Sequence, residues 1–367
     1  MISVIIPVYN GEGFIKDTVN SILNQTIEDI EIIIVNDGST DATEEILQTI
    51  QDKRIKYFKQ ENKGAAAAKN LGLKHCQGNF ITFHDSDDLS LPNRFEKLLE
   101  GFHGNIGFVH SDMLLINETN QPIGYWQSSN IQPDDVFSFF LNVGTPFNNG
   151  TILYRREVLE NQHFNPYKIG EDTEFVIKIA MKHASYHIHA PLYLYRRHSG
   201  NSTKGFSYEQ LAEHIKGIIQ NTDYNEQLND IISVNGNKEK CQLKAHLIMG
   251  EALASRGMIQ EGYKFFETAI PLIKDQMDRD FFEGMKALVE KRYEDAIRIF
   301  GGFQTKDHII ENYLGEAFLS IKNFNKAYKH FFNALINKPN YGTPLQNLKA
   351  LGQLNSHHLV CQYKHKF

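Results

Sequence analysis

The stretch Phe80-Ile81-Thr82-Phe83-His84-Asp85-Ser86-Asp87-Asp88 joins a short apolar run to a cluster of carboxylates. Residues 80–83 predict a buried strand, so the acidic residues come where that strand should end. Three carboxylates within four residues repel one another and favour a compensating cation. Oxygen ligands on a short loop suit Mg²⁺ or Mn²⁺, ions that often carry a substrate diphosphate as well. The alternative is a solvated acidic turn or a helix N-cap, since residues 89–99 look helical.

Strands and helices alternate on both sides of this stretch. Runs of β-branched and aromatic residues predict strands over residues 2–8, 30–35, 55–58 and 80–83. Helical spacing of apolar residues predicts helices over residues 14–23, 42–50 and 64–75. Strands that alternate with helices of about a dozen residues indicate an α/β domain with a mostly parallel central sheet.

Polar clusters follow three of these strands. Tyr9-Asn10, Asn36-Asp37 and Asp85 to Asp88 each come directly after a strand or within two residues of its end. In open parallel α/β sheets, ligands bind outside the carboxyl ends of the strands. The polar residues on this edge therefore predict a ligand site.

The motifs of this half resemble those of the inverting, nucleotide-sugar-dependent glycosyltransferases of family 2, which have the GT-A fold. The matching segments are Val4 to Asn10, Ser21 to Thr26, Ile34 to Asp41 and Lys69 to Gly72, followed by the acidic motif Asp85 to Asp88 and a later acidic pair, Glu171-Asp172. Each motif alone is weak, and their common order makes the resemblance specific. It covers residues 1–205 and implies a GT-A catalytic domain there.

The resemblance implies a nucleotide site at the ends of the first two strands. Asp37 would accept a hydrogen bond from the imide N–H of a uracil or thymine ring, and the alternative role is an Asx turn or helix cap. The wall around the base and ribose would consist of Pro7, Val8, Tyr9 and Asn10. Lys69 takes a position usually held by arginine, where it would contact the base or a phosphate, or lie in solvent.

The resemblance also implies a metal site in the acidic motif. Asp87 is the expected direct ligand of Mn²⁺ or Mg²⁺, with Asp85 and Asp88 assisting through ribose or water contacts. The ion would bridge the donor diphosphate and neutralise charge on the leaving group. Ser86 belongs to the same donor-binding motif, and His198 is a candidate for a phosphate or metal contact, or for neither.

Glu171-Asp172 opens a predicted helix over residues 173–182. Carboxylates in a first helical turn favour the helix dipole, which is the structural alternative to a catalytic role. The resemblance makes Asp172 the general base that deprotonates the acceptor, so that a single displacement inverts the anomeric centre. Glu171 would orient Asp172 or contact a sugar hydroxyl.

A repeat follows in the last third of the chain. Gly250, Gly284 and Gly315 are 34 and 31 residues apart, and each is followed after 12 residues by Gly262, Ala296 or Ala327 and four residues later by Phe266, Phe300 or Phe331. The pattern resembles the tetratricopeptide repeat, in which small residues let paired helices approach and aromatic rings fill the gap between them. We expect a helical linker over 206–240 and an all-α repeat domain over 241–367.

Composition excludes several other classes of protein. The net charge of −6 over 367 residues gives no general reason to bind nucleic acid or acidic lipid. No apolar run reaches the roughly 20 residues of a membrane span, and the first residues lack the pattern of a signal peptide. Three widely spaced cysteines form no disulfide framework, so a cytoplasmic location is the expectation.

The leading hypothesis is a metal-dependent inverting hexosyl- or N-acetylhexosaminyl-transferase with a UDP-sugar as its expected donor. The acceptor would be a glycan, a cell-surface polymer or a polypeptide, and the repeats would bind that acceptor, a partner protein or a second copy. The rival is a catalytically degenerate transferase domain that acts as a protein-binding scaffold. A dinucleotide-dependent dehydrogenase is disfavoured, because the first strand-to-helix turn, residues 9–13, lacks the three-glycine fingerprint.

Overall fold

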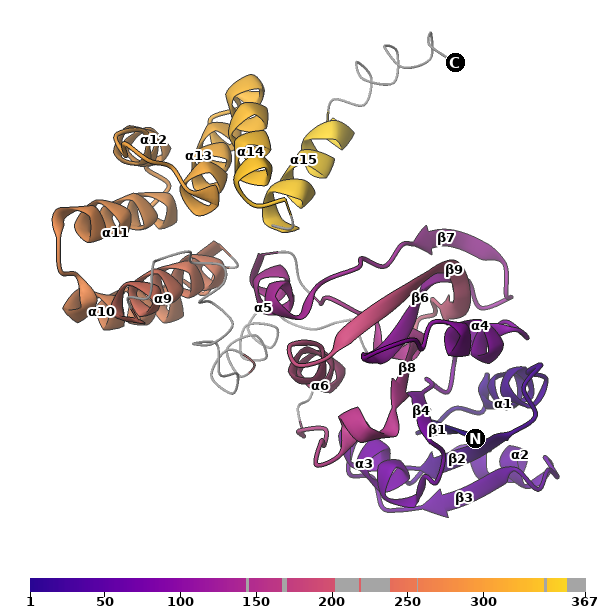
Figure 1. Ribbon diagram of the computed structural model, residues 1–367. Helices are drawn as coiled ribbons and strands as arrows, with labels where there is room; N and C mark the ends of the chain where they lie inside the picture. Colours follow the sequence, from indigo (N-terminus) through magenta and orange to yellow (C-terminus); the bar gives the residue numbers. More distant parts are fainter. Residues whose placement is uncertain are drawn as a thin grey trace, which may run out of the picture. The chain divides into compact units, whose positions relative to one another are not determined.

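The computed structural model describes residues 1–142, 145–166, 170–201, 218, 238–255, 257–339 and 342–354. It divides into two compact units (Figure 1). The first comprises Met1–Pro133 and Thr145–His214, and the second comprises Asp134–Gly144 and Ile215–Phe367. The predicted linker over 206–240 lies almost wholly outside the described residues, so its boundaries remain predictions.

A single sheet forms the core of the first unit. Its strands are β1 (Ile2–Val8), β2 (Ile30–Asn36), β3 (Ile55–Lys59), β4 (Phe80–Phe83), β5 (Leu89–Ser90), β6 (Ile106–Ile116), β7 (Pro122–Trp126), β8 (Ile152–Arg155) and β9 (Ala184–Arg196). Across the sheet they follow the order β3-β2-β1-β4-β8-β6-β9-β5, and β7 pairs with β6.

The sheet is parallel in its first half and mixed beyond it. All four strands predicted from the sequence are present, and β1 pairs in parallel with both β2 and β4, as β2 does with β3. The later strand β8 is antiparallel to both β4 and β6, whereas β6 and β9 are parallel. The predicted α/β fold is therefore confirmed, with an antiparallel strand at the centre of a curled mixed sheet.

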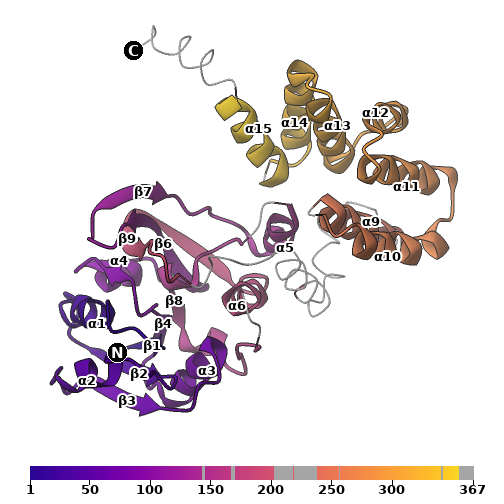
Figure 2. The ribbon, with the colours of Figure 1, turned by 180° about the vertical axis from the view of Figure 1, so that it is seen from behind.

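Helices cover both faces of this sheet. They are α1 (Ile15–Leu23), α2 (Thr43–Gln48), α3 (Ala65–His75), α4 (Arg94–Glu100) and α6 (Glu171–Ala180), with two 3-10 turns, η1 (Asn149–Thr151) and η2 (Arg156–Leu159). The views from both sides show α1 and α2 on the face opposite α3 (Figure 2). The helix expected over residues 89–99 begins only at Arg94, because Leu89–Ser90 pair as a short strand with β9.

The packing of the first unit follows the alternation of β1. Val4 and Ile6 join a buried cluster with Ile15 and Val19 of α1. On the opposite face α3 approaches β1 closely at Gly72, where an added Cβ would lie 2.4 Å from Ile5 Cγ2. This close approach explains why a glycine follows Lys69-Asn70-Leu71 in the sequence.

Helices joined by short turns make up the described part of the second unit. Its helices are α5 (Pro133–Asn142), α9 (Lys238–Ser255), α10 (Ile259–Ala269), α11 (Gln276–Val289), α12 (Tyr293–Gly301), α13 (His308–Ser320), α14 (Phe324–Asn337) and α15 (Gly342–Leu354), with a 3-10 turn η3 (Ile270–Leu272). Within the part of the chain that the structure describes, no helix is both long enough and apolar enough to cross a membrane.

The predicted repeat positions meet inside helical hairpins. A Cβ added at Gly250 would lie 2.6 Å from the ring of Phe266. A Cβ added at Gly284 would lie at the same distance, 2.6 Å, from the ring of Phe300. A Cβ added at Gly315 would lie 2.4 Å from the ring of Phe331. All three rings are buried. The helical C-terminal region is thus confirmed, and the tetratricopeptide assignment itself stays a resemblance.

One element of the second unit comes from the N-terminal half of the sequence. Residues 134–144, which contain most of α5, group with the helical unit. Val136, Phe137 and Phe140 of α5 are buried, and Asp135 Oδ1 lies 3.7 Å from Lys338 Nζ. The chain therefore leaves the sheet unit after Pro133 and returns to it at Thr145.

Candidate active site

Two loops lie together at the carboxyl ends of β1 and β2. Asn10 adopts a left-handed backbone conformation with φ 50°, and its Oδ1 accepts a hydrogen bond of 2.8 Å from the backbone N–H of Thr40. The backbone N–H of Gly11 donates to Thr43 Oγ1 at 2.8 Å. Among the residues expected to form the base and ribose wall, Val8 is buried and Pro7 is partly buried, while Tyr9 and Asn10 are exposed.

Asp37 follows β2 directly and is 3% exposed. Its Oδ1 accepts from Gln60 Nε2 at 2.6 Å and from the Lys63 backbone N–H at 2.9 Å, while Oδ2 accepts from the Gly64 backbone N–H at 2.8 Å. These contacts anchor the segment that leads into α3. A carboxylate offers about four lone-pair sites, so three donors leave one acceptor position for a ligand N–H.

The acidic motif begins on a buried base. His84 is 0% exposed, and its Nε2 lies 3.0 Å from Ser90 Oγ. Burial, and then the positive charge of Arg94, lower the pKa of His84 to about 3. Burial raises the pKa of Asp85 to about 7; Lys69 opposes this rise, whereas the nearby carboxylates of Asp172 and Asp87 add to it.

Asp87 and Asp88 differ sharply in exposure. The Asp87 side chain is 27% exposed, and its Oδ2 lies 2.8 Å from His198 Nε2 and accepts from Asn201 Nδ2 at 3.3 Å. Asp88 is 0% exposed, its Oδ1 accepts from the Arg196 backbone N–H at 2.7 Å, and its buried Oδ2 has no hydrogen-bond partner. Asp88 thus lies beneath the loop, which differs from the ribose or water contact expected from the sequence.

The later acidic pair meets Lys69. Glu171 and Asp172 open α6 after Gly170, whose φ is 71°. Lys69 Nζ lies 2.7 Å from Asp172 Oδ1 and 3.0 Å from Glu171 Oε1, and the lysine side chain is 3% exposed. The alternative that Lys69 lies in solvent is therefore wrong. Asn149 Nδ2 also donates to Asp172 Oδ1, at 2.9 Å.

The charged side chains of this group change one another's pKa values. Burial lowers the pKa of Lys69, but the attraction of Asp172, Glu171 and Asp85 outweighs burial and leaves that pKa raised. Burial raises the pKa of Asp172, and Lys69 reduces this effect without cancelling it. The acidic motif and the acidic pair, separated by more than 80 residues in the sequence, thus form one electrostatic group around Lys69.

Sequence reasoning gave no role to several residues that build this site. The guanidinium of Arg196 lies 4.6 Å from the Phe14 ring centre, and its Nε donates to the Asp87 carbonyl at 2.6 Å. The Phe14 ring is 4.8 Å from that of His198. Arg196 lies two residues before His198 in the sequence. Its contact with Asp88 could not be predicted, because the two residues are 108 positions apart.

The donor set fits a divalent cation. Asp85 and Asp87 bring partly exposed carboxylates to one loop, His198 adds an imidazole, and the buried Oδ2 of Asp88 has no hydrogen-bond partner. Carboxylate oxygens suit Mg²⁺ and Mn²⁺, and a nitrogen ligand is acceptable to Mn²⁺. Burial is the main cause of the raised pKa of Asp85, and the carboxylates of Asp172 and Asp87 add to it; a cation would relieve their repulsion.

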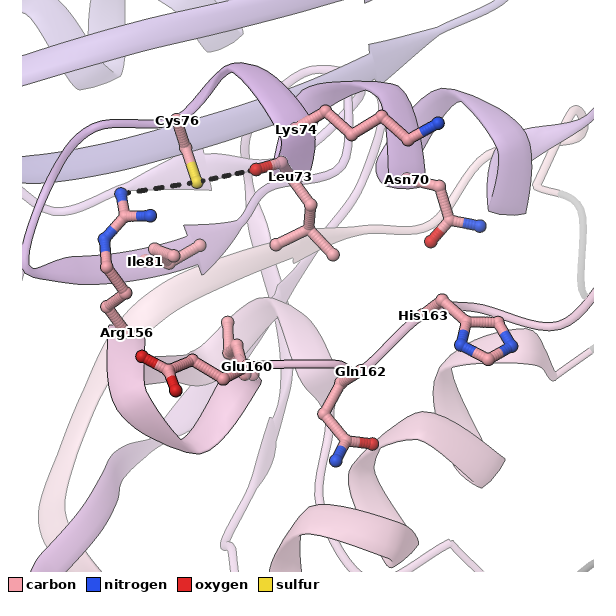
Figure 3. A pocket seen from close by; sticks show the side chains of 10 residues that line it. Asn70, Leu73, Lys74, Cys76, Ile81, Arg156, Glu160, Gln162 and His163 are labelled. Atoms are coloured by element: carbon pink, nitrogen blue, oxygen red, sulfur yellow. Dashed lines mark hydrogen bonds between the residues drawn. The ribbon is translucent and has the colours of Figure 1, made fainter.

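A separate hollow of about 370 Å³ lies near the end of α3 (Figure 3). It is lined by Asn70, Leu73, Lys74, Cys76, Ile81, Arg156, Leu159, Glu160, Gln162 and His163. Arg156 points toward Cys76, whose Sγ lies 3.6 Å from Nη2 (Figure 3). Burial raises the pKa of the Cys76 thiol, which agrees with the packed role expected for this cysteine. None of the predicted site residues lines this hollow.

Comparison with known proteins places these motifs in context. The family model described as glycosyl transferase family 2 matches residues 3–162. An uncharacterized glycosyltransferase of Haemophilus influenzae is 35% identical over 190 residues, which are 48% of this chain and 70% of that protein. The GalNAc(5)-diNAcBac-PP-undecaprenol beta-1,3-glucosyltransferase of Campylobacter jejuni is 31% identical over 204 residues, 53% of this chain and 64% of that protein.

Other curated relatives and a solved structure extend the comparison. The chain spans about a third of the length of several curated relatives, between 32% and 36%. The crystal structure of S. aureus TarS 1-349 in complex with UDP-GlcNAc has a TM-score of 0.51 and 19% identity, over 95% of this chain and 91% of that chain. At this identity the likeness concerns the fold, which is that of a GT-A transferase.

Proposed function

The chain belongs to glycosyl transferase family 2, and on that premise we propose that it moves a sugar from a nucleotide-diphospho-sugar, with UDP as the nucleotide, to a glycan, cell-surface polymer or polypeptide. The reaction inverts the anomeric centre and uses Mn²⁺ or Mg²⁺. One observation carries the proposal: the acidic motif and the pair Glu171-Asp172 meet around Lys69 at the carboxyl edge of the sheet.

Asp172 is the proposed general base. Lys69 and Asn149 both bind its Oδ1, which leaves Oδ2 to receive the proton of the acceptor hydroxyl. Its side chain is 33% exposed, so an acceptor reaches it from solvent. The raised pKa of Asp172 makes its carboxylate a stronger base than an exposed aspartate. Glu171 shares Lys69 and thereby orients the pair.

Asp87 and His198 would hold the metal ion, with Asp85 beside them. A bound ion supplies positive charge to the donor diphosphate and to the leaving nucleotide. Arg196 holds the loop from below through the Asp87 carbonyl and the Asp88 carboxylate. Asp37, with one acceptor position left, would accept the imide N–H of uracil and would disfavour cytosine, which has an acceptor at that ring position.

The names of two similar proteins support a class of sugar for transfer. The Campylobacter jejuni relative is by its name a glucosyltransferase, and the TarS structure contains UDP-GlcNAc, so hexosyl or N-acetylhexosaminyl transfer is the proposed class. The rival function is a degenerate domain that serves as a scaffold. All five acidic residues and Lys69 are engaged in one charged group, which favours an active site over a remnant.

Calorimetric titration of the full chain with UDP tests the proposal. Binding should require added Mn²⁺ or Mg²⁺ and should disappear with a chelator. Asp87→Ala should lose the metal-dependent part, whereas Asp17→Ala, at an exposed position of α1, should bind as the wild type does. Equal UDP affinity with and without chelator would contradict the metal role. Failure to bind UDP or to hydrolyse any UDP-sugar under all conditions would favour the scaffold.

A further inference from the structure

A second group of titratable side chains lies between β6 and β9 of the sheet unit. Asp112, His187 and His189 each offer a potential metal ligand, and these atoms all lie within 4.8 Å of one another. Asp112 and His187 are buried, whereas His189 is exposed. None of the three belongs to the motifs of the candidate active site.

An irregularity in the strand pairing brings these residues together. His110 pairs with His187 and Ser111 with Ile188, but the next residue, Asp112, pairs with Pro191. His189 and Ala190 are therefore extra residues of β9 opposite β6. A bulge of this kind bends a strand and redirects a side chain, and bulges are common beside functional sites. Here it places His189 next to Asp112.

Asp112 is oriented as metal-binding carboxylates are. Its Oδ1 accepts from the backbone N–H of Ser128 at 2.8 Å and lies 2.7 Å from His187 Nε2, while Oδ2 accepts from the Tyr125 hydroxyl. Ligating carboxylates and imidazoles are usually held by such outer hydrogen bonds. Asp112 and His187 thus form a pre-oriented oxygen and nitrogen pair in the sheet.

A neighbouring histidine carries a buried ring nitrogen without a partner. His110 is 0% exposed, and its ring stacks on that of His187 at 4.8 Å with an interplanar angle of 2°. Its Nδ1 lies 2.9 Å from Ser128 Oγ, but its buried Nε2 has no hydrogen-bond partner. Buried polar atoms without partners are rare and often indicate a water or an ion.

We propose that Asp112, His187 and His189 bind one divalent transition metal ion of the Zn²⁺ class, separate from the ion of the acidic motif. Two imidazole nitrogens and one carboxylate oxygen are ligands that Zn²⁺ prefers, whereas Mg²⁺ favours oxygen alone. The ion takes the place of the hydrogen between His187 Nε2 and Asp112 Oδ1, and these two atoms separate from 2.7 Å to roughly 3.3 Å. The imidazole of His187 stays neutral, with its single proton now on Nδ1. His189 turns in from the surface, and a water takes the fourth position.

Titration of the full chain with Zn²⁺ and with Co²⁺ tests this site. The Asp87→Ala background removes the ion of the acidic motif, so the remaining binding reports the second site. We expect one ion per chain, visible d–d absorption from tetrahedral Co²⁺, and a higher Tm with Zn²⁺. In that background His189→Ala should weaken binding at least roughly 100-fold and abolish the absorption band. His189 is exposed, so this variant should fold even if Asp112→Asn does not.

Two controls make the result decisive. His163→Ala removes another exposed histidine of the same unit and should leave binding unchanged. His357→Ala/His358→Ala removes neighbouring histidines near the C-terminus of the sequence and should also leave it unchanged. The proposal is overturned if the Asp87→Ala chain binds no Zn²⁺, if His189→Ala binds it as tightly as its parent, or if only the C-terminal double variant loses it.

Discussion

Lys69 and Asp172 form the contact on which the chemistry of the proposed site depends. A buried lysine without partners would lose its proton, but two carboxylates within 3.0 Å keep it charged. The charge of Lys69 in turn reduces the repulsion between the carboxylates of Glu171 and Asp172 at the start of α6. Removal of any one of these charges leaves the others uncompensated, so their effects should not be additive.

Asp172→Asn tests the base assignment. The substitution keeps the size of the side chain and the oxygen that Lys69 and Asn149 bind, but it removes the group that accepts the proton. We expect kcat to fall by roughly 10²–10⁴-fold with little change in UDP affinity. Steady-state kinetics and calorimetry on the same preparation measure both quantities. Glu171→Gln is the matched comparison and should lower kcat less. A wild-type kcat for Asp172→Asn would assign the base elsewhere.

The sequence predicted correctly which of these residues share an edge of the sheet, but it did not predict how deeply each side chain is buried. The sequence indicated that Asp37 and the acidic motif share one edge, because strand ends of a parallel sheet meet there. Glu171-Asp172 was assigned to the same site only through the family resemblance. The sequence did not indicate that Asp88 is buried, since the cause is a backbone N–H donated by Arg196, 108 residues away. Contacts of this range depend on the folded chain and leave no local pattern.

At the scale of elements, the Gly–Phe pairs decide how close the helices of each hairpin lie. The ring of Phe331 occupies the space that a side chain at Gly315 would need, and the same arrangement recurs at Gly250 and Gly284. Helix propensity opposes glycine at these positions by roughly 0.5–1 kcal/mol relative to alanine. The packing of a buried ring must therefore outweigh that cost.

Gly315→Ala should destabilise the helical unit by about 1–3 kcal/mol, because the new Cβ would lie 2.4 Å from Phe331 Cε1. Gly352→Ala in α15 is the matched control, since nothing lies within 4 Å of its added Cβ. That control should be neutral or stabilising by up to roughly 1 kcal/mol. Calorimetric unfolding of the full chain measures both variants. Equal effects in the two variants would show that helix propensity, and not the ring contact, governs these glycines.

Glu316 of α13 gives the helical unit a dependence on pH. Its Oε1 accepts from Asn312 Nδ2 at 2.7 Å and from Asn347 Nδ2 at 3.3 Å, and burial raises its pKa from 4.5 to about 7 despite these donors. The folded state thus holds a proton that the unfolded state has lost between pH 4.5 and about 7. Stability contributed by this group is present below that window and falls as pH rises through it.

Glu316→Gln should therefore stabilise the helical unit at pH 8 by roughly 1–3 kcal/mol and change little near pH 4, because glutamine keeps the accepting oxygen and carries no charge. Thermal unfolding at both pH values measures the difference. Glu283→Gln, at an exposed position of α11, should show no such dependence on pH. An equal gain at pH 4 and pH 8 would mean that the charge of Glu316 is not the cause.

The sequence predicted those strands and helices that form from a local pattern of residues. The strands β1 to β4 are continuous β-branched or aromatic runs, and the helical repeats have constant internal offsets. The two residues of β5 form a strand only because β9, more than 100 residues away, offers them a partner. The antiparallel insertion of β8 between β4 and β6 likewise depends on pairing across the chain. For this reason the sequence predicted a mostly parallel sheet and the structure has a mixed one.

At the scale of the whole molecule, the nucleotide motifs and the repeats belong to different units. Every proposed donor contact lies before residue 205, and the described repeat helices begin at Lys238. Residues 134–144 interrupt this separation, because they group with the helical unit although they precede β8 and α6 in the sequence. The chain thus passes from one unit to the other three times, whereas two domains in simple sequence order would need a single passage.

A chain truncated near residue 235 tests how far the units are independent. It should bind UDP as the full chain does, since its donor site is complete, but it should aggregate. The reason is that Val136, Phe137 and Phe140 of α5, all buried, would lose the helical unit with which they group. Val136→Ser/Phe137→Ser/Phe140→Ser should restore solubility to the truncated form, and the same triple variant should destabilise the full chain. Sedimentation measures the solubility and the oligomeric state of each.

With a soluble truncated form, the role of the repeats becomes measurable. A helical array offers an extended partner many weak contacts, which raise acceptor affinity without touching the chemistry. If the array captures the acceptor, truncation should raise KM for the natural acceptor while kcat toward a short acceptor stays near that of the full chain. If the array joins two copies, the full chain should sediment as an oligomer and the truncated form as a monomer. Unchanged acceptor kinetics in a soluble monomer would exclude acceptor capture, because the bond-forming groups Lys69, Glu171 and Asp172 all remain in the truncated chain.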